Sequence, residues 1–359
     1  MALHVQEYLR SGGTLEGLTT TLGINVKRHG KYPHLVLLKY SQIESPMANP
    51  IVQECRGIIL DESNNWNVVF HGMNKFFNYG EGHAATIDWA TARFQEKVDG
   101  SLIGLYLYNG AWEVCTSGTP DASGEVNASG KTFREYFDET LGGRFNNGDA
   151  GVNDFNYWLE LTGPVNRVVV PHSTPGVTLL GARNIHTGNE VHPSEVSRYF
   201  PGVPLAREFP LRTIEDLMNT FGTMSPLQQE GYVVVDGNFN RIKVKHPGYV
   251  ALHHAKDAMT TKAFVEIART GEVSEVIAAF PEFKPLLDDA KRRYDELLAA
   301  IEADYAAHKD IPVQRDFAMA VKDSRCSAAC FQLRAGKVKT IREFLAKCHI
   351  DIMMRMLGY

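Results

Sequence analysis

Short apolar and β-branched runs, rather than long amphipathic segments, dominate the chain from about residue 34 to residue 250. Glycine, proline, asparagine and aspartate bound these runs, which is typical of β-strands. Helical patterns are few there, and residues 132–140 form one of them. Because the strands do not alternate regularly with helices, the pattern argues against a doubly wound parallel sheet and predicts an antiparallel α+β core. The predicted strands are residues 34–40, 55–61, 66–70, 102–108, 112–115, 158–161, 167–170, 177–180, 231–236 and 241–245.

Turn residues predict two hairpins among these strands. Asn109-Gly110 is the dipeptide favoured in two-residue hairpin turns. Asp236-Gly237-Asn238 supplies the turn residues between the last two predicted strands.

After about residue 250 the apolar positions change period. They recur every three or four residues, which predicts amphipathic helices, and glycines become rare. We therefore expect two domains, residues 1–250 with the sheets and residues 251–359 as an all-helical domain. The two apolar series are Leu286, Leu287, Ala290, Tyr294, Leu297, Leu298, Ile301 and Tyr305, and then Val338, Ile341, Phe344, Leu345, Cys348, Ile352 and Met356.

The composition is that of a globular chain. The 359 residues are 44% hydrophobic and 22% charged, which excludes a disordered, collagen-like or disulfide-stapled protein. No apolar run approaches the roughly 20 residues of a membrane span, and no signal peptide is expected. The five cysteines lack the spacing of a secreted framework, so we expect a reducing, cytoplasmic compartment, that of the host if the chain is viral.

The net charge gives a misleading first impression of the binding partner. The formal charge of −5 argues against nucleic acid when it is taken over the whole chain. Residues 251–359, however, contain 17 basic and 16 acidic residues, and residues 322–347 contain seven basic residues against two acidic ones. That local excess suits backbone phosphates if the helices present it on one face, with an affinity that weakens with salt.

The first candidate for chemistry is the segment Glu96-Lys97-Val98-Asp99-Gly100-Ser101, which lies between two strand-like runs. In an extended segment Lys97 and Asp99 share one face while Val98 points to the core. Gly100 allows a backbone or a ligand to approach closely. A solvated surface turn explains the same residues, so this segment alone decides nothing.

Two lysines share one face of the predicted strand 241–245. Lys243 and Lys245 are two residues apart, whereas Ile242 and Val244 point to the other face. Neighbouring cations repel each other, so an anion would justify the arrangement. The alternative is an edge strand that the lysines protect from pairing.

Three further segments carry chemistry or core packing. The guanidinium group of Arg56, in Glu54-Cys55-Arg56-Gly57, is suited to bind phosphate or carboxylate with two hydrogen bonds. Phe76-Phe77, next to Lys75, either pack a base or belong to the core. Glu160 lies in an apolar strand, so it needs a cation or metal partner if it is buried, or else faces solvent.

Two other patterns match known sites only in part. Residues 124–132 (GEVNASGKT) have five residues between the glycines where a P-loop has four, and no hydrophobic strand precedes them. We expect a loop there, with Thr132 capping the following helix. The set Cys326, Cys330, Cys348 and His349 fits no standard zinc spacing, and the cysteines are interpreted as structural thiols.

Together and in this order, the segments resemble the bacteriophage T4 RNA ligase 1 type family, the ATP-dependent tRNA-repair RNA ligases of the covalent nucleotidyltransferase superfamily. The resemblance covers nearly the whole chain, although the position of Tyr40 is matched only loosely. The matching motifs are Glu54 to Gly57, Lys75 to Asn78 with Gly80-Glu81, Lys97 to Ser101, Glu160 with Asn166-Arg167, Glu230-Gly231, Lys243 with Lys245, and Tyr249 to His253.

The resemblance implies a role for each matching residue. Residues 1–250 would be the adenylyltransferase domain, and residues 251–359 would engage RNA or tRNA, although mere packing explains the helices equally well. Lys97 would be the nucleophile that forms lysyl-AMP, and the other catalytic residues would be Asp99, Lys243 and Lys245. The ATP-binding residues would be Tyr40, Arg56, Lys75, Phe77, Gly100, Glu230, Lys243 and Lys245. Glu160 and Glu230 would be metal or ribose partners, and Tyr249 and Arg167 would support RNA binding or the active site.

The implied reaction has three steps. Lys97 attacks the α-phosphate of ATP, AMP passes to an RNA 5′-phosphate, and a 3′-hydroxyl then seals the ends. Neighbouring cations favour the neutral amine, and Mg²⁺, for which Mn²⁺ can substitute, would neutralise phosphate oxygens. The implied partners are single-stranded or nicked RNA, with the tRNA anticodon loop as a candidate, and an end-healing kinase/phosphatase; no membrane partner is expected.

One departure from the family and several alternatives stay open. The family has a lysine downstream of the nucleophile where this chain has Ser117-Gly118-Thr119, and Lys131 is a candidate replacement. A DNA ligase or capping-type enzyme shares the nucleophile motif, but an OB-fold usually follows it, whereas this chain continues with a helical pattern. A P-loop polynucleotide kinase and a non-catalytic RNA-binding module are the remaining alternatives.

Overall fold

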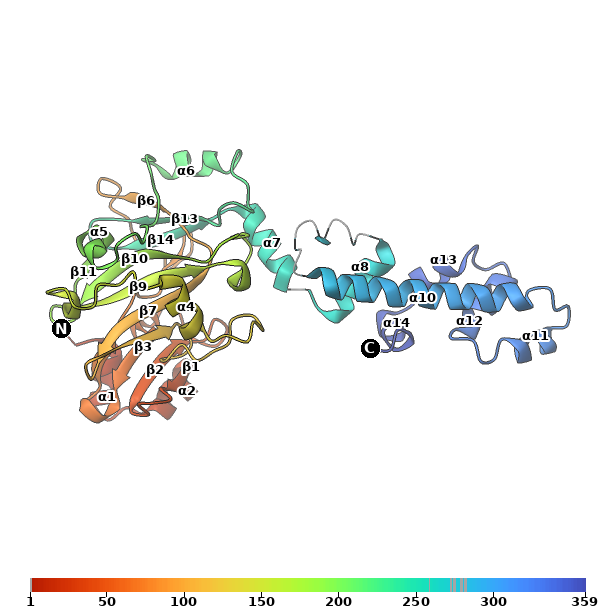
Figure 1. Cartoon of the computed structure of the whole chain (residues 1–359), viewed down its shortest axis with the longest axis horizontal. Coiled ribbons are helices and arrows are strands. Elements are labelled where there is room, and N and C mark those ends of the chain that lie inside the picture. The colour runs from red at the N-terminus through yellow and green to blue at the C-terminus, as the bar shows by residue number, and fades with distance from the viewer. Residues whose placement is uncertain (1, 258, 272, 274–275, 278–279, 281–282) are drawn as a thin grey trace. The chain divides into compact units, whose positions relative to one another are not determined.

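The computed structural model describes residues 2–257, 259–271, 273, 276–277, 280 and 283–359. The chain divides into two compact units, Met1–Ala251 and Leu252–Tyr359, and Figure 1 labels most of their helices and strands. The first unit contains three mainly antiparallel sheets, which confirms the predicted α+β core. The described residues of the second unit form helices and no strand.

The first sheet of the unit, here called the N-terminal sheet, has the order β1-β2-β3-β4. Its strands and the helices beside it are β1 (Ile24–Arg28), β2 (Leu35–Tyr40), β3 (Arg56–Asp61), β4 (Asn67–Phe70), α1 (His4–Arg10), α2 (Leu15–Leu22) and α3 (Pro50–Glu54). Val36 and Leu38 of β2 pack with α1 and α2, whereas Leu35 and Leu37 pack with Tyr106 of the next sheet. Both faces of β2 are therefore buried, which explains its uninterrupted apolar sequence.

The central sheet has the order β11-β10-β9-β7-β8. Its strands are β7 (Ser101–Tyr108), β8 (Ala111–Thr116), β9 (Phe155–Thr162), β10 (Gly176–Asn184) and β11 (Glu190–Val191), and α4 (Phe133–Leu141) packs on it. Asn109 and Gly110 both have positive φ, 49° and 76°, which confirms the predicted two-residue hairpin.

The third sheet has the order β12-β6-β13-β14-β5, and only β5 runs parallel to its neighbour. Its strands are β5 (Phe77–Asn78), β6 (Arg93–Glu96), β12 (Glu208–Phe209), β13 (Gly231–Val235) and β14 (Arg241–Lys245). Ile242 and Val244 are buried with Leu217 of α6 (Ile214–Thr220), so Lys243 and Lys245 share the opposite face, as predicted. The edge-strand explanation of these lysines is wrong, because β14 lies between β13 and β5.

One predicted strand is absent. Residues 167–170 form no strand, and the three valines that follow Arg167 form bends. The backbone N–H groups of Val169 and Val170 donate to the carboxylate of Asp99 at 2.9 and 2.6 Å. A side chain has therefore taken the donors that a strand ladder would use.

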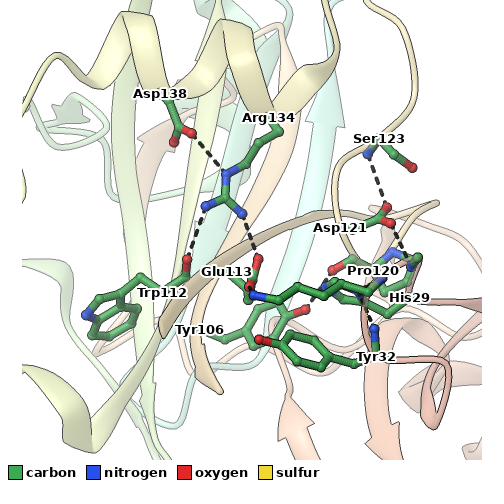
Figure 2. A network of polar contacts seen from close by, with 12 residues as sticks. His29, Tyr32, Tyr106, Trp112, Glu113, Pro120, Asp121, Ser123, Arg134 and Asp138 are labelled. Atoms are coloured by element: carbon green, nitrogen blue, oxygen red, sulfur yellow. Dashed lines mark hydrogen bonds and ion pairs between the residues drawn. The ribbon is translucent and has the colours of Figure 1, made fainter. Parts of the chain in front are cut away.

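A polar network ties the loop after β1 to the central sheet (Figure 2). The N–H of Gly30 donates to Asp121 at 3.0 Å. Arg134 of α4 reaches Glu113 at 2.8 Å and Asp138 at 2.9 Å. Tyr106 donates to the carbonyl of Pro120 at 2.7 Å. The network is structural, because none of these residues lines the cavities described below.

The remaining short helices of the first unit are α5 (Pro193–Val196), η1 (Glu62–Asn64), η2 (Val152–Asp154), η3 (Pro164–Asn166) and η4 (Ser197–Tyr199), and α7 (Pro247–Asp257) spans the division between the units. The helices of the second unit are α8 (Thr261–Thr270), α10 (Lys284–His308), α11 (Gln314–Ala320), α12 (Ser327–Arg334), α13 (Ile341–Ala346) and α14 (Ile350–Met356). The predicted helix near Leu286 is confirmed as α10, although Leu286 itself is 53% exposed. The second apolar series forms two helices, because His349 caps a new start at α14.

The five cysteines are free thiols, and three of them are buried. Among the described residues, no helix is long and apolar enough to cross a membrane.

Candidate active site

Three neighbouring strands of the third sheet bring the predicted nucleophile to the lysines of β14. Lys97 follows β6 directly, and its backbone N–H donates to the carbonyl of Gly231 at 3.0 Å. Gly231 begins β13 and pairs with Lys245 of β14. Residues that are more than 130 positions apart in sequence therefore meet at one end of this sheet.

Glu230 is the acid at the centre of this group. Its carboxylate accepts from Lys97 Nζ at 2.7 Å and from Lys245 Nζ at 2.8 Å, and the residue is only 2% exposed. A buried carboxylate that holds two ammonium groups is well compensated. An ammonium in an ion pair is not a nucleophile, so the predicted role of Lys97 would require it to leave Glu230 as a neutral amine.

Lys243 is the cation of this face that lacks an acid. No carboxylate among the described residues pairs with it, in contrast to Lys97 and Lys245. Burial, followed by the charges of Lys75, Lys245, Lys97 and Arg56, lowers the pKa of Lys243 from 10.5 to about 8. Lys243 is thus a charge that an incoming phosphate would stabilise.

A cavity of about 230 Å³, here called the lysine cavity, opens over these groups. Its wall combines cations, aromatic rings and acids from all three sheets. The predicted residues that line it are Tyr40, Arg56, Lys75, Lys97, Glu160, Lys243 and Lys245. The predicted residues that do not line it are Phe77, Asp99, Gly100, Arg167, Glu230 and Tyr249.

Sequence reasoning gave no role to Arg241 of this wall, and it selected Phe77 rather than Phe76 as the ATP-binding aromatic residue. Arg241 lines the lysine cavity, and it lies on β14 at the same two-residue spacing as the two lysines. The alternation that identified Lys243 and Lys245 could also have identified it. Phe76 lines the cavity, whereas Phe77 is buried and packs its ring against His83.

Arg56 carries an unused hydrogen-bond donor. Its Nη1 atom is buried and has no partner, while the guanidinium lies 5.1 Å from the ring centre of Phe76. Burial lowers the pKa of Arg56. Because buried donors are almost always satisfied in folded proteins, this one indicates a ligand oxygen.

Glu160 is the buried acid among the two glutamates, Glu96 and Glu160, that line the lysine cavity. Burial raises its pKa from 4.5 to about 7, although the positive charges of Lys97 and Arg56 act in the opposite direction. Glu160 is therefore buried among cations, and the alternative that it faces solvent is wrong. A carboxylate with a raised pKa beside a cavity is typical of a functional site.

Asp99 anchors the segment 97–101 to neighbouring parts of the fold through three hydrogen bonds. Its Oδ2 accepts from Val169 and Val170, and its Oδ1 accepts from the hydroxyl of Tyr249 at 2.7 Å. Tyr249 is buried, and its ring lies 5.3 Å from Lys245 Nζ. A Cβ atom on Gly100 would lie 2.3 Å from the carbonyl oxygen of Leu161, so glycine lets this segment lie against β9.

Arg167 and the region of the missing family lysine lie outside the cavity wall. Arg167 donates to the carbonyl of Val169 at 2.9 Å. Lys131 pairs with Glu139 at 2.6 Å on an exposed loop and lines neither cavity. The cation that lies near Ser117-Gly118 is Lys39, whose Nζ is 3.8 Å from the position of a Cβ on Gly118.

The P-loop-like segment is a loop, as predicted. A bridge between Glu125 and Thr132 closes it, and the Thr132 side chain accepts from the N–H of Glu135 at the start of α4. A strand that leads directly into the loop, which a phosphate-binding P-loop requires, is absent from residues 117–123.

Known proteins are similar to this chain. Residues 54–249 match the sequence profile of a family described as RNA ligase. A protein of Autographa californica nuclear polyhedrosis virus, whose name describes a bifunctional polynucleotide kinase/RNA ligase, is 28% identical over 79% of this chain and 43% of its own length. An RNA ligase of Rhodothermus phage RM378 is 26% identical over 72% of this chain and 73% of its own length. An archaeal ATP-dependent RNA ligase of known structure has 14% identity and a TM-score of 0.43, over 99% of this chain and 81% of its own. The chain thus spans less than half the length of the first of these relatives.

Proposed function

The chain belongs to the RNA ligase family, and from that premise we propose that it joins RNA ends with ATP as the energy source. The observation that carries the proposal is the lysine cavity, where Lys97 meets cations from separate segments of the chain. A lysine nucleophile needs cations that favour its neutral form and bind phosphate. This group supplies both.

In the proposed first step, Lys97 Nζ gives up a proton to solvent water and attacks the α-phosphorus of ATP. The new bond joins nitrogen to phosphorus, and the bond from phosphorus to the bridging oxygen of pyrophosphate breaks. Lys245, freed from its share of Glu230, would contact the α-phosphate, where negative charge develops. Lys243, which has no acid partner among the described residues, would bind the pyrophosphate.

Arg56, Tyr40 and Phe76 would bind the rest of the nucleotide. The unpaired Nη1 of Arg56 suits a phosphate or ribose oxygen. Lys75 lies 4.8 Å from the ring centre of Tyr40 and pairs with no acid among the described residues. It can therefore contact a phosphate without first breaking an ion pair. Phe76, rather than Phe77, has the exposure to pack against the adenine.

Glu160 is the residue that we propose as a partner of Mg²⁺. The described residues contain no group of three acids, histidines or cysteines that could hold a metal ion alone. Mg²⁺ usually binds one or two carboxylates together with substrate phosphates, which a single buried glutamate fits. Glu230 fits less well, because two lysines already occupy its carboxylate. When bound, the ion would neutralise phosphate oxygens.

The RNA steps follow the same chemistry. The AMP on Lys97 would pass to a 5′-phosphate, and a 3′-hydroxyl would then displace AMP to form the phosphodiester. Single-stranded or nicked RNA, such as a cleaved tRNA anticodon loop, is the proposed substrate, and an end-healing kinase/phosphatase would prepare its ends.

The second unit is proposed to contribute to RNA affinity. Among the seven basic residues of the segment 322–347, Lys322 and Lys347 pair with acids, whereas Lys337 and Lys339 form no ion pair in the part of the chain that the structure describes. Reversing these two charges (Lys337→Glu with Lys339→Glu) should weaken tRNA binding and flatten its salt dependence. The same double change at Lys284 and Lys291, which pair along α10, is the control; equal effects would remove this role.

The experiment that tests the proposed function compares two substrates. With ATP and Mg²⁺, the protein should seal 5′-phosphorylated single-stranded or nicked RNA faster than a nicked DNA duplex. Faster sealing of the DNA duplex would instead identify a DNA ligase of the same superfamily.

A further inference from the structure

A second cavity, of about 700 Å³, adjoins the lysine cavity and shares Lys75, Phe76 and Arg241 with it. Its volume lies within the roughly 300–1,000 Å³ of ordinary ligand sites. The nucleotide chemistry proposed above is centred on the smaller cavity, although Lys75 and Phe76, which it uses, also line the larger one. The larger one therefore has room for a second substrate beside the nucleophile.

Two aromatic rings of this larger cavity have no place in the core. Phe76 and Phe239 are half-buried, and neither belongs to an apolar cluster of the described residues. Each has an arginine over its ring, Arg56 at 5.1 Å and Arg241 at 5.6 Å. Aromatic rings combined with arginines are the usual platform on which single-stranded bases stack.

Phe239 is also held in a costly backbone conformation. Its φ is +62°, in the left-handed region that bulky residues rarely adopt. The carboxylate of Asp236 fixes this turn, since its Oδ1 accepts from the N–H groups of Asn238 and Asn240, both at 2.9 Å. Glycine or asparagine would suit the turn better, so a phenylalanine here is explained by what its ring contacts.

The charge of the larger cavity favours an anion. Arg183 and Arg241 both line it, and they share the single carboxylate of Glu190 at 2.8 and 2.6 Å. All three side chains are nearly buried, so this array keeps a net positive charge in a poorly hydrated wall. Lys75, at the boundary with the lysine cavity, adds a cation that has no acid partner among the described residues.

We infer that the larger cavity binds the 5′-terminal nucleotides of the RNA strand that receives AMP, with a base stacked on Phe239 and the terminal phosphate near Lys75 and Arg241. This inference rests on the RNA ligase activity proposed above, according to which the strand that receives AMP is RNA. A 5′-phosphate oxygen at the boundary attacks the phosphorus of lysyl-AMP. The oxygen–phosphorus bond forms, the nitrogen–phosphorus bond to Lys97 breaks, and Lys97 Nζ takes up a proton from solvent water.

The test uses Phe239→Asn, because Phe239 lines only the larger cavity and asparagine tolerates its φ. Tyr79→Asn, at an aromatic residue that is 48% exposed and lines neither cavity, is the matched control. Binding is measured by fluorescence anisotropy of labelled single-stranded RNA octamers with a 5′-phosphate or a 5′-hydroxyl. A Lys97→Ala background prevents any reaction during the measurement.

In this background we expect Phe239→Asn to weaken binding of the phosphorylated RNA by about 5- to 150-fold, the usual effect of losing one stacked base. Tyr79→Asn should change it less than twofold. The phosphorylated octamer should also bind more tightly than the hydroxyl form. Equal binding by Phe239→Asn and its parent would overturn the stacking site, and equal binding of the two octamers would overturn the assignment of the 5′ end.

A second measurement separates this inference from the proposed function. With Lys97 restored, Phe239→Asn should form lysyl-AMP at the wild-type rate but transfer AMP to 5′-phosphorylated RNA more slowly at low RNA concentration. If the wild type forms no lysyl-AMP, the proposed function is refuted. The anisotropy result would still decide whether the larger cavity binds RNA.

Discussion

Replacement of Glu160 is expected to raise stability while it lowers activity. Burial raises the pKa of this carboxyl group from 4.5 to about 7, and the positive charges of Lys97 and Arg56 offset only part of that effect. Ionised Glu160 is therefore less favourable in the folded protein than in the unfolded chain. Glu160→Gln removes the ionisable group and keeps the size of the side chain.

The magnitude follows from the linkage between protonation and folding. A carboxyl group whose pKa rises on folding stabilises the fold while it is protonated, fully so below about pH 4.5, and this contribution is lost as the pH rises through about 7. At about 1.4 kcal/mol per pH unit, the interval from 4.5 to 7 corresponds to about 3.5 kcal/mol. Relative to the wild type, Glu160→Gln should gain about 3 kcal/mol of unfolding free energy at pH 8 and under about 0.5 kcal/mol at pH 4.5.

Tryptophan fluorescence during urea unfolding measures this difference for the first structural unit, which contains Glu160. All four tryptophans lie within residues 66–158, so the signal reports the first unit alone. Glu44→Gln, at an exposed glutamate, is the control and should change little at either pH. An equal effect of Glu160→Gln at both pH values would refute the reasoning. The variant should also lose most of its lysyl-AMP formation if Glu160 acts as proposed.

Three further predictions concern neighbouring residues. Because burial and the nearby cations lower the pKa of Lys243 to about 8, pyrophosphate inhibition of adenylylation should weaken above pH 8 in the wild type but not in Lys243→Arg; parallel weakening in both would contradict this. Gly100→Ala, whose Cβ would meet a backbone oxygen at 2.3 Å, should lose about 1–3 kcal/mol of unfolding free energy, whereas Gly82→Ala, with no atom within 4 Å, should lose under about 0.5. Asp99→Ala, which removes three buried hydrogen bonds, should lower the unfolding free energy by at least about 3 kcal/mol. Tyr249→Phe, which removes one of them, should lower it by about 1.5–3 kcal/mol. Urea unfolding that ranks the two variants in the opposite order would refute the positioning role of Asp99.

The hydrophobic pattern predicts a strand only where burial of one or both faces selects an alternation or a run of apolar residues. β14 alternates polar and apolar residues because a single face is buried, and it was recognised on that basis. β6 (Arg93–Glu96) was missed because just one of its four residues, Phe94, is buried. Its neighbours β12 and β13 make it a strand, and they lie more than 100 residues further along the chain.

The sequence likewise predicts some features of the candidate site and not others. The order of the motifs indicated which residues would act together, and seven of them line one cavity. Sequence spacing could not show that Glu230 bridges Lys97 and Lys245, or that Asp99 points away from the cavity toward Val169 and Tyr249. Those contacts depend on how separate strands and loops pack, which no local pattern encodes.

The proposed function depends above all on the covalent attachment of AMP to Lys97. Incubation with α-labelled ATP and Mg²⁺, followed by a denaturing gel, tests it directly. The wild type should carry the label, γ-labelled ATP should leave the protein unlabelled, and Lys97→Ala should carry none. Absence of label on the wild type, or undiminished label on Lys97→Ala, would contradict the covalent mechanism.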